Sequence, residues 1–74
     1  MKHNYPDPGL YAGKQLQLLM RKNHRTQEDF AEDLNVDVRT VRRWIHEGIS
    51  DIHRIFEIAD FFGIYAQQML PFTR

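Results

Sequence analysis

Apolar residues recur every three or four positions in successive parts of this 74-residue chain, with short polar breaks between them. This period is that of an α-helix with one buried face. It predicts helices over about residues 10–22, 26–34, 38–46 and 51–62, and a short fifth helix over 64–70. No stretch predicts a strand, so we expect an all-α fold, a compact bundle of five short helices around one small core.

Residues suited to helix ends stand at the predicted boundaries. Asn23 and Gly63 are candidates for the left-handed residue that follows a helix. Side chains that can accept a hydrogen bond from the first turn precede the second, third and fourth helices, namely those of Thr26, Asp37 and Asp51. The break at 35–37 is only three residues long, so we expect the second and third helices to form a helix-turn-helix.

The N-terminal segment differs from the rest of the chain. It contains "YPDPGL", whose two prolines and glycine favour a turn. We expect residues 1–9 to form an irregular arm and residues 10–74 to form one domain. Helical phase predicts that five apolar side chains share the core of this domain, those of Val41, Trp44, Phe56, Ala59 and Phe62.

The segment 38–46 predicts a helix with two opposite faces. At about 100° per residue, Val41, Trp44 and Ile45 fall on one side of the helix. The opposite side carries the basic residues Arg39, Arg42, Arg43 and His46. We interpret this basic face as a contact surface. The alternative is that it only balances the acids of the second helix, Glu28, Asp29, Glu32 and Asp33.

Net charge alone does not indicate a polyanionic partner, because ten Lys and Arg balance ten Asp and Glu. The charges are nevertheless sorted along the chain. The segments 21–25 and 39–43 hold six of the ten cations, whereas 28–37 has five acids and no base. Sorted charge is what a one-sided electrostatic footprint requires.

Composition excludes several kinds of site. The chain has no cysteine, so it can form neither a disulfide nor a thiolate metal site. Its apolar runs are far shorter than the roughly 20 residues that cross a bilayer. We therefore expect a soluble cytoplasmic protein with no membrane partner. The histidines of "HEGISDIH" (46–53) match no metal-ligand spacing, so we expect neither an enzyme nor a bound metal or cofactor.

Two blocks of the sequence resemble a known family. "TQEDFAEDLNVDVRTVRRW" and "DIHRIFEIADFFGI" are similar, in order and spacing, to the lambda repressor-like helix-turn-helix domain of the Cro/C1 (XRE) type, and the resemblance covers about residues 11–70. Three positions depart from the family pattern. Asn35 replaces a glycine, which it can do because Asn tolerates the left-handed conformation. Arg25 replaces an apolar residue, which weakens hydrophobic packing there, and Gly48 comes one position late, which lengthens the third helix or alters the loop.

The resemblance implies that the third helix, 38–46, enters the major groove of double-stranded DNA. The positions it implies for base edges or nearby phosphates are Val38, Arg39, Thr40 and Arg43. Arginine can present a fork to guanine O6 and N7, and valine can pack on a thymine methyl group. The implied function is transcription regulation, by repression, in a bacterium or phage.

Other positions are expected to contact the DNA backbone. Gln27 corresponds to a glutamine that binds a phosphate, next to the positive end of the second helix. Arg42 and His46 are also expected to contact phosphates. Trp44 corresponds to a core position of the family.

A winged-helix regulator is disfavoured, a protein-binding module remains an open alternative, and a homodimer is a hypothesis about assembly. A winged-helix regulator needs a β-wing after Gly48, where "SDIHRIFEIADFF" predicts a helix instead. A protein-binding module, such as an antirepressor or adaptor, would keep the fold and use the acidic face of the second helix. A homodimer through the fifth helix and the tail would use apolar residues of that region, Tyr65, Met69, Leu70 and Phe72.

Overall fold

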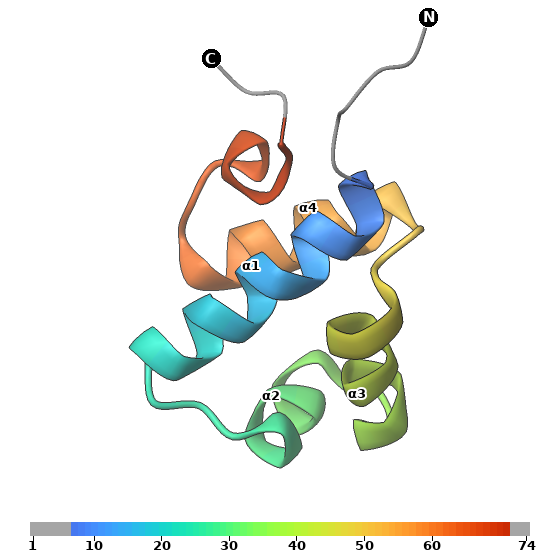
Figure 1. Cartoon of the computed structure of the whole chain (residues 1–74). Helices are drawn as coiled ribbons and strands as arrows, with labels where there is room; N and C mark the ends of the chain where they lie inside the picture. Colours follow the sequence, from blue (N-terminus) through green and yellow to red (C-terminus); the bar gives the residue numbers. More distant parts are fainter. Residues whose placement is uncertain (1–6, 72–74) are drawn as a thin grey trace, which may run out of the picture.

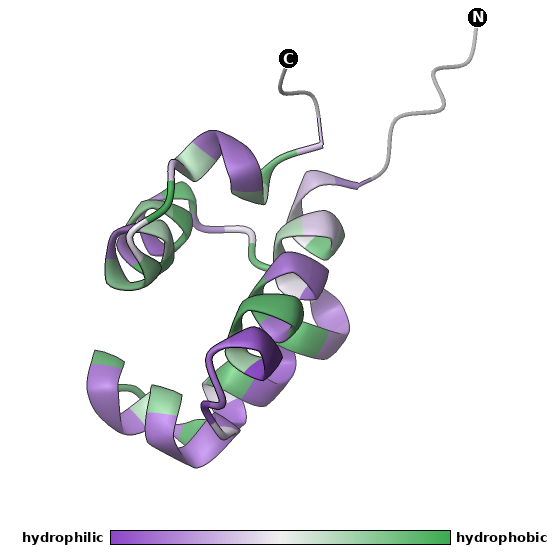
Figure 2. Ribbon diagram, turned by 90° about the vertical axis from the view of Figure 1, so that its left-hand side faces the viewer, coloured by the Kyte–Doolittle hydropathy of each residue, from purple (hydrophilic) through white to green (hydrophobic). Residues whose placement is uncertain are grey.

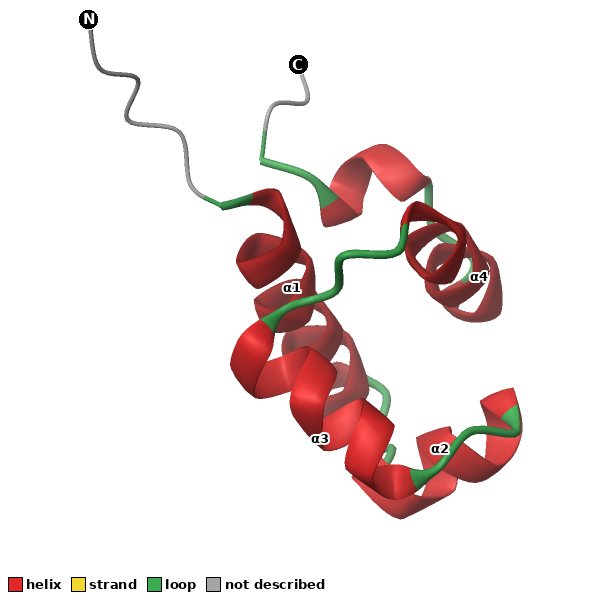
Figure 3. Cartoon of the chain, turned by 90° about the vertical axis from the view of Figure 1, so that its right-hand side faces the viewer, coloured by secondary structure: helices red, strands yellow, loops and turns green. Residues whose placement is uncertain are grey.

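The computed structural model describes residues 7–71 of the chain, so predictions for residues 1–6 and for Phe72 lie outside it. The described part is all-α, as expected, and contains no strand (Figure 3). Four α-helices precede a 3-10 helix in the order α1 (Pro8–Lys22), α2 (Gln27–Leu34), α3 (Val38–Glu47), α4 (Ile52–Phe62) and η1 (Ala66–Met69). Figure 1 shows α2 and α3 together at one end of the molecule and η1 at the other, with α1 between them.

The short fifth helix predicted over 64–70 is present as the 3-10 helix η1 and is shorter than predicted, since it covers only Ala66–Met69. The backbone is extended at Tyr65 and again at Leu70, so four residues are left for the helix. Pro71 explains the second limit, because a proline disfavours helical backbone in the residue before it.

Helix α1 ends at Lys22, as predicted, but its start and the left-handed residue after it differ from the prediction. The helix begins at Pro8, two residues earlier than expected, because the carboxylate of Asp7 accepts the amide of Gly9 at 2.8 Å and proline has no amide to lose at the first position. Residues 8 and 9 therefore belong to α1 and not to an irregular arm. At the other end the left-handed residue is His24 (φ 57°), not Asn23, whose side chain instead donates to the Leu19 carbonyl at 2.8 Å.

The helix-turn-helix is confirmed as α2 and α3. Thr26 caps α2 by accepting the amide of Asp29 at 3.0 Å, and Asp37 caps α3 by accepting the amide of Arg39 at 2.8 Å. Asn35 adopts the left-handed conformation (φ 57°, ψ 46°) that the family pattern assigns to glycine. The later glycine, Gly48, ends α3 at Glu47, one residue beyond the predicted end.

The core lies where the inner faces of the helices meet, and each helix carries both hydrophobic and hydrophilic residues (Figure 2). Trp44 is a core residue, as predicted, with 8% of its surface exposed. Phe56 is not, because 53% of its surface is exposed. Ile58 occupies the interior instead, since the buried face of α4 is centred on Ile55, Ile58 and Ala59, and Phe56 lies too far around the helix from that direction.

Helices α1 and α3 touch through their backbones. A Cβ atom at Gly13 would lie 2.2 Å from the carbonyl oxygen of Trp44, so only glycine allows this approach. The amide of Ile49 donates to the Gly9 carbonyl at 3.0 Å, which ties the end of α3 to the start of α1. The position of α3 on the domain is therefore fixed by main-chain contact.

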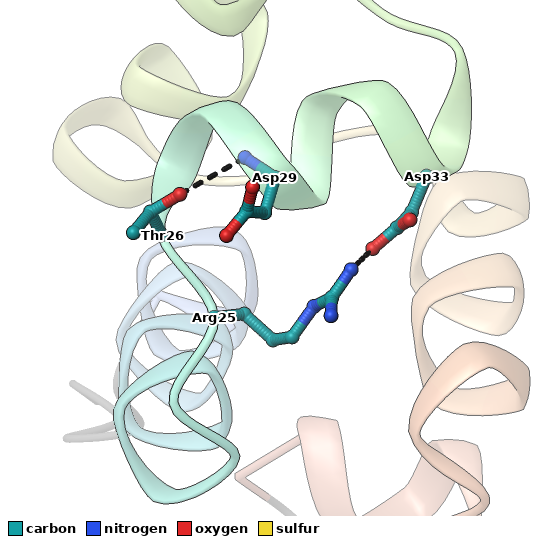
Figure 4. A network of polar contacts seen from close by, with 4 residues as sticks. All are labelled: Arg25, Thr26, Asp29 and Asp33. Atoms are coloured by element: carbon teal, nitrogen blue, oxygen red, sulfur yellow. Dashed lines mark hydrogen bonds and ion pairs between the residues drawn. The ribbon is translucent and has the colours of Figure 1, made fainter.

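Aromatic rings join α2 to α4. Phe30 stacks on Phe62, with ring centroids 5.5 Å apart, and meets Phe61 edge-on at 5.4 Å. Arg25 extends from the segment before α2 and pairs with Asp33 near the end of that helix (Figure 4). Its guanidinium also lies over the Phe61 ring, 5.9 Å from the centroid. An ion pair and a cation–π contact thus replace the apolar packing that the family pattern has at this corner.

Candidate nucleic-acid interface

The two faces of α3 are separated as the sequence predicted. Val41, Trp44 and Ile45 are buried against the rest of the domain. The four basic side chains, those of Arg39, Arg42, Arg43 and His46, belong to exposed residues. The apolar side anchors α3, so its basic side faces solvent, and we call these four exposed residues the basic face.

The first turn of α3 is less exposed than the basic face. Val38 is half-buried and packs against the core, so part of its side chain already has a partner within the domain. Thr40 is also half-buried, and within residues 7–71 its hydroxyl makes no hydrogen bond. A ligand at this end of the helix would meet the outer parts of both side chains.

Arg39 contacts the residue that caps its own helix. The Asp37 carboxylate accepts the Arg39 amide, and the same oxygen lies 3.5 Å from Nε of the Arg39 guanidinium. The amide hydrogen bond, followed by the guanidinium, holds the pKa of Asp37 below its ordinary value of 3.8. Asp37 is therefore ionised at neutral pH, and a negative charge stands at the start of the basic face.

Arg42 joins α3 to the beginning of α2. Its Nε donates to Oε1 of Gln27 at 3.4 Å, so the structure brings these two predicted site residues together. With its oxygen used in this way, the Gln27 amide keeps its Nε2 hydrogens as donors toward solvent.

The basic face is not neutralised by the acids of α2. The ion pairs among residues 7–71 are Arg25 with Asp33, Arg39 with Asp37 and Arg54 with Glu57. Arg39 is thus the one residue of the basic face with an ion-pair partner in this range, and that partner belongs to the cap of α3. The interpretation that the basic face only balances α2 gains no support from the contacts.

Two contacts near this face were missed at the sequence level. The pairing of Asp37 with Arg39 was not foreseen, although an acid at a helix cap two residues before an arginine is a readable signal. Arg54 on α4 lies over the Trp44 ring, 5.6 Å from its centroid, and pairs with Glu57 at 2.8 Å. No periodicity could have placed Arg54 against Trp44, because this contact depends on where the fold places α4 relative to α3.

The structure changes the set of residues that could form the surface predicted for a homodimer. Met69 is fully buried within the domain, so it cannot supply an interface with a second chain. Tyr65 is 76% exposed and Leu70 is half-buried. Among the described residues, Ile52 and Phe56 on α4 are two further large apolar side chains with exposed surface.

The described range contains neither a candidate metal site nor a candidate membrane span. Between Asp7 and Pro71, no three histidine, aspartate or glutamate side chains are grouped in a way that could hold a metal ion. In the same part of the chain, no helix has both the length and the hydropathy to span a bilayer.

Comparison with known protein families gives a match over the part of the chain that contains α2 and α3. A family model described as helix-turn-helix matches residues 16–68, which is more than half of the chain and runs from α1 to η1. Neither the curated proteins nor the solved structures gave a match.

Proposed function

This chain belongs to the helix-turn-helix family of the Cro/C1 (XRE) type, a family of DNA-binding transcription regulators, and from that premise we propose that it is a cytoplasmic, sequence-specific repressor of transcription. The observation that carries the proposal is the basic face of α3. It is exposed, it lies opposite the buried side of the helix, and the acids of α2 do not pair with it. A surface of this shape and charge suits the major groove of double-stranded DNA, which admits one α-helix.

In this proposal the basic face divides its contacts between bases and backbone. Arg39 and Arg43 reach base edges, where each guanidinium can donate two hydrogen bonds to guanine O6 and N7. Val38 and Thr40, half-buried at the first turn, contact the neighbouring bases with their outer atoms. Val38 is suited to a thymine methyl group, and the Thr40 hydroxyl can donate or accept.

Three residues contact the DNA backbone in this proposal, namely Gln27, Arg42 and His46. The contact between Arg42 and Gln27 places a cation beside an amide donor at the start of α2. The free amides of that helix end add partial positive charge, so a phosphate between the two helices would meet three kinds of donor. His46, one turn further along α3, is placed to contact the next phosphate.

Removing single arginines tests this division of roles. On a duplex selected from a random library, Arg43→Ala should weaken binding by about 1–3 kcal/mol, with a much smaller loss on a scrambled duplex. Arg42→Ala should weaken both duplexes alike and reduce the salt dependence of log K by roughly one unit. Titrations at two salt concentrations measure both effects.

The same titrations separate the proposal from a protein-binding role. The exposed acids Glu28, Asp29 and Glu32 line a hollow of about 450 Å³ together with Val36 and Val38, and this surface favours a partner protein. A protein-binding module would show no affinity for any duplex at low salt. Equal losses on both duplexes for all the arginines of α3 would instead mean that the basic face positions the protein without reading sequence.

We also propose that the protein binds DNA as a homodimer, because one short helix contacts few base pairs and helix-turn-helix proteins place two such helices about 34 Å apart on a two-fold axis. The surface we propose combines Tyr65 and Leu70 with Ile52 and Phe56 of α4. Ile52 and Leu70 line one hollow of about 480 Å³, so these parts of the surface are continuous.

Two polar residues of α4 suit a second copy of the same chain. His53 and Asp60 are exposed and lie on the same side of α4 as Phe56. If two copies of α4 pack antiparallel about an axis near Phe56, His53 of each copy comes beside Asp60 of the other. The surface is then complementary to itself, which a two-fold interface requires.

A further inference from the structure

Asp37 contacts the basic face in two ways at once. One carboxylate oxygen accepts the Arg39 amide at 2.8 Å and so caps α3, and the same oxygen lies 3.5 Å from Nε of the Arg39 guanidinium. Both side chains remain open to solvent, with relative exposures of 83% for Arg39 and 55% for Asp37. A pair this exposed contributes little to folding, so removing it should not unfold the protein.

We propose that Asp37 is a specificity-determining residue, which positions the Arg39 guanidinium for one base pair and at the same time weakens binding to DNA of any other sequence. This inference rests on the proposed function. The residues expected to contact DNA are basic or uncharged, and the inference adds one acidic residue, Asp37, to them.

The positioning follows from which nitrogen is held. Asp37 lies beside Nε, so the two terminal nitrogens of Arg39 remain available. These two nitrogens can form the bidentate fork that matches guanine O6 and N7. The contact biases the guanidinium toward this orientation, which reduces the side-chain freedom that Arg39 loses on binding. Arg42 has a similar contact through Nε, but with the neutral amide of Gln27. Among residues 7–71, Arg39 is the arginine of α3 whose Nε lies beside a carboxylate.

The weaker binding to unrelated DNA follows from the position of the Asp37 carboxylate at the start of α3. The start of a helix carries partial positive charge, which attracts phosphates, and the Asp37 carboxylate opposes it. Binding to unrelated DNA depends almost entirely on attraction to phosphates, so this carboxylate lowers it directly. At the preferred site the hydrogen bonds of Arg39 compensate for the loss. The gap between the two affinities widens, as in other interfaces where a repulsive element excludes wrong partners.

Folding alone does not require an aspartate at this position. Serine and asparagine cap helices about as well as aspartate, and Thr26 caps α2 without a charge. Because the Asp37 pKa is lowered by the Arg39 amide and guanidinium, the carboxylate carries its charge wherever DNA binding would be measured. The charge is therefore the property that the proposed role uses.

The chain supplies a matched control. Asp51 caps α4 with the same geometry, its carboxylate accepting the His53 amide at 2.9 Å. In the described range Asp51 has no arginine partner. Asp37→Ser and Asp51→Ser thus remove the same charge and keep the same kind of cap, but only the first removes the contact with Arg39.

The experiment measures affinity for a selected and a scrambled duplex, using the full chain. For Asp37→Ser we expect the ratio of the two affinities to fall about threefold to tenfold, mainly because the scrambled duplex binds more tightly. Asp37→Asn keeps an oxygen for Arg39 and should fall between the wild type and the serine variant. Asp51→Ser should leave the ratio unchanged within about twofold. Circular dichroism melts of all variants check that the caps are retained.

The same substitution made in an Arg39→Ala variant decides whether Asp37 acts through Arg39. In Arg39→Ala, the further change Asp37→Ser should still raise general affinity but should not lower the ratio again. A ratio that falls equally in both backgrounds would mean that Asp37 reads a base itself, and an unchanged ratio in the wild-type background would refute any role in specificity. Either result overturns the inference while the proposed function stands. If the wild type binds no duplex at low salt, the proposed function fails and the inference fails with it.

Discussion

At the scale of single residues, side chains at helix starts decide where the helices begin. Four of them accept amides of the first turn, those of Asp7, Thr26, Asp37 and Asp51. Asp37 differs from the others in also contacting a guanidinium, and its pKa is lowered, first by the Arg39 amide and then by the Arg39 side chain. A carboxyl whose pKa is lowered by folding stabilises the fold above its ordinary pKa and loses this contribution as the pH falls through the lower value.

The pH dependence of stability tests this contribution. We expect wild type to be more stable than Asp37→Asn at neutral pH, because an ionised acid at a helix start is favourable. The difference should stay constant down to about pH 5 and should shrink as the pH falls below the ordinary value of 3.8, where the aspartate becomes neutral like the asparagine. Urea unfolding followed by circular dichroism at several pH values measures it. A difference that does not change with pH would contradict the lowered pKa.

Gly13 is the residue at which the contact between α1 and α3 is most sensitive. Alanine should gain up to about 1 kcal/mol of helix propensity over glycine. Its Cβ would nevertheless meet the Trp44 carbonyl at 2.2 Å, and a backbone atom cannot move aside as a side chain can. We expect Gly13→Ala to cost about 1–3 kcal/mol and to lower the melting temperature by at least about 5 °C. The neighbouring exposed residue provides the control, since Lys14→Ala should change the melting temperature little.

At the scale of elements, helix-capping rules together with the helical period predicted more of the structure than the helical period alone. The caps of α2, α3 and α4 and the two-sided α3 follow from side chains close in sequence, and all were predicted. The buried face of α4 was misplaced toward Phe56, since the pattern "IFEIADFF" allows more than one apolar stripe and packing against the other helices selects one. The 3-10 helix η1 and the contact between Asp37 and Arg39 also depend on geometry that periodicity does not contain.

The joint between α2 and α4 gives a prediction at this scale. Arg25 pairs with Asp33 and covers Phe61, with about a third of each charged side chain still exposed. Because water screens the pair, we expect Arg25→Ala to cost only about 1–2 kcal/mol, shared between the ion pair and the cation–π contact. A double-mutant cycle with Asp33→Ala should give a coupling of up to about 1 kcal/mol. A coupling near zero would assign the whole effect to the contact with the ring.

At the scale of the whole molecule, the core is small enough for one side chain to decide whether the protein folds. Trp44 belongs to the hydrophobic core and is buried there. Trp44→Ala should cost about 3–5 kcal/mol, which is comparable with the entire stability of so short a chain. Far-UV circular dichroism should show a largely unfolded protein. Leu18→Ala, at a side chain that is 55% exposed, should melt close to wild type.

The proposed homodimer is also tested at this scale. Phe56→Asp should convert a dimer into a monomer in sedimentation equilibrium, whereas Leu18→Asp, on another face, should leave the association unchanged. Asp60→Lys should weaken the dimer by removing the acceptor that lies opposite His53, and the double change His53→Glu with Asp60→Lys should restore it by placing opposite charges across the interface. A wild type that is monomeric and binds one per duplex at sites without two-fold symmetry would exclude the dimer.

The separation of the two faces of α3 has a consequence for how this protein can change its target. Side chains that hold the helix in place, such as Trp44, are distinct from those on the basic face, such as Arg39 and Arg43. Substitutions at exposed positions away from caps usually alter stability by less than about 0.5 kcal/mol. A library randomised at 39, 43 and 46 should therefore consist mostly of folded proteins, and selection from it should yield variants with new operators. On the proposed function, the DNA sequence that this domain recognises can therefore be changed without redesigning the fold.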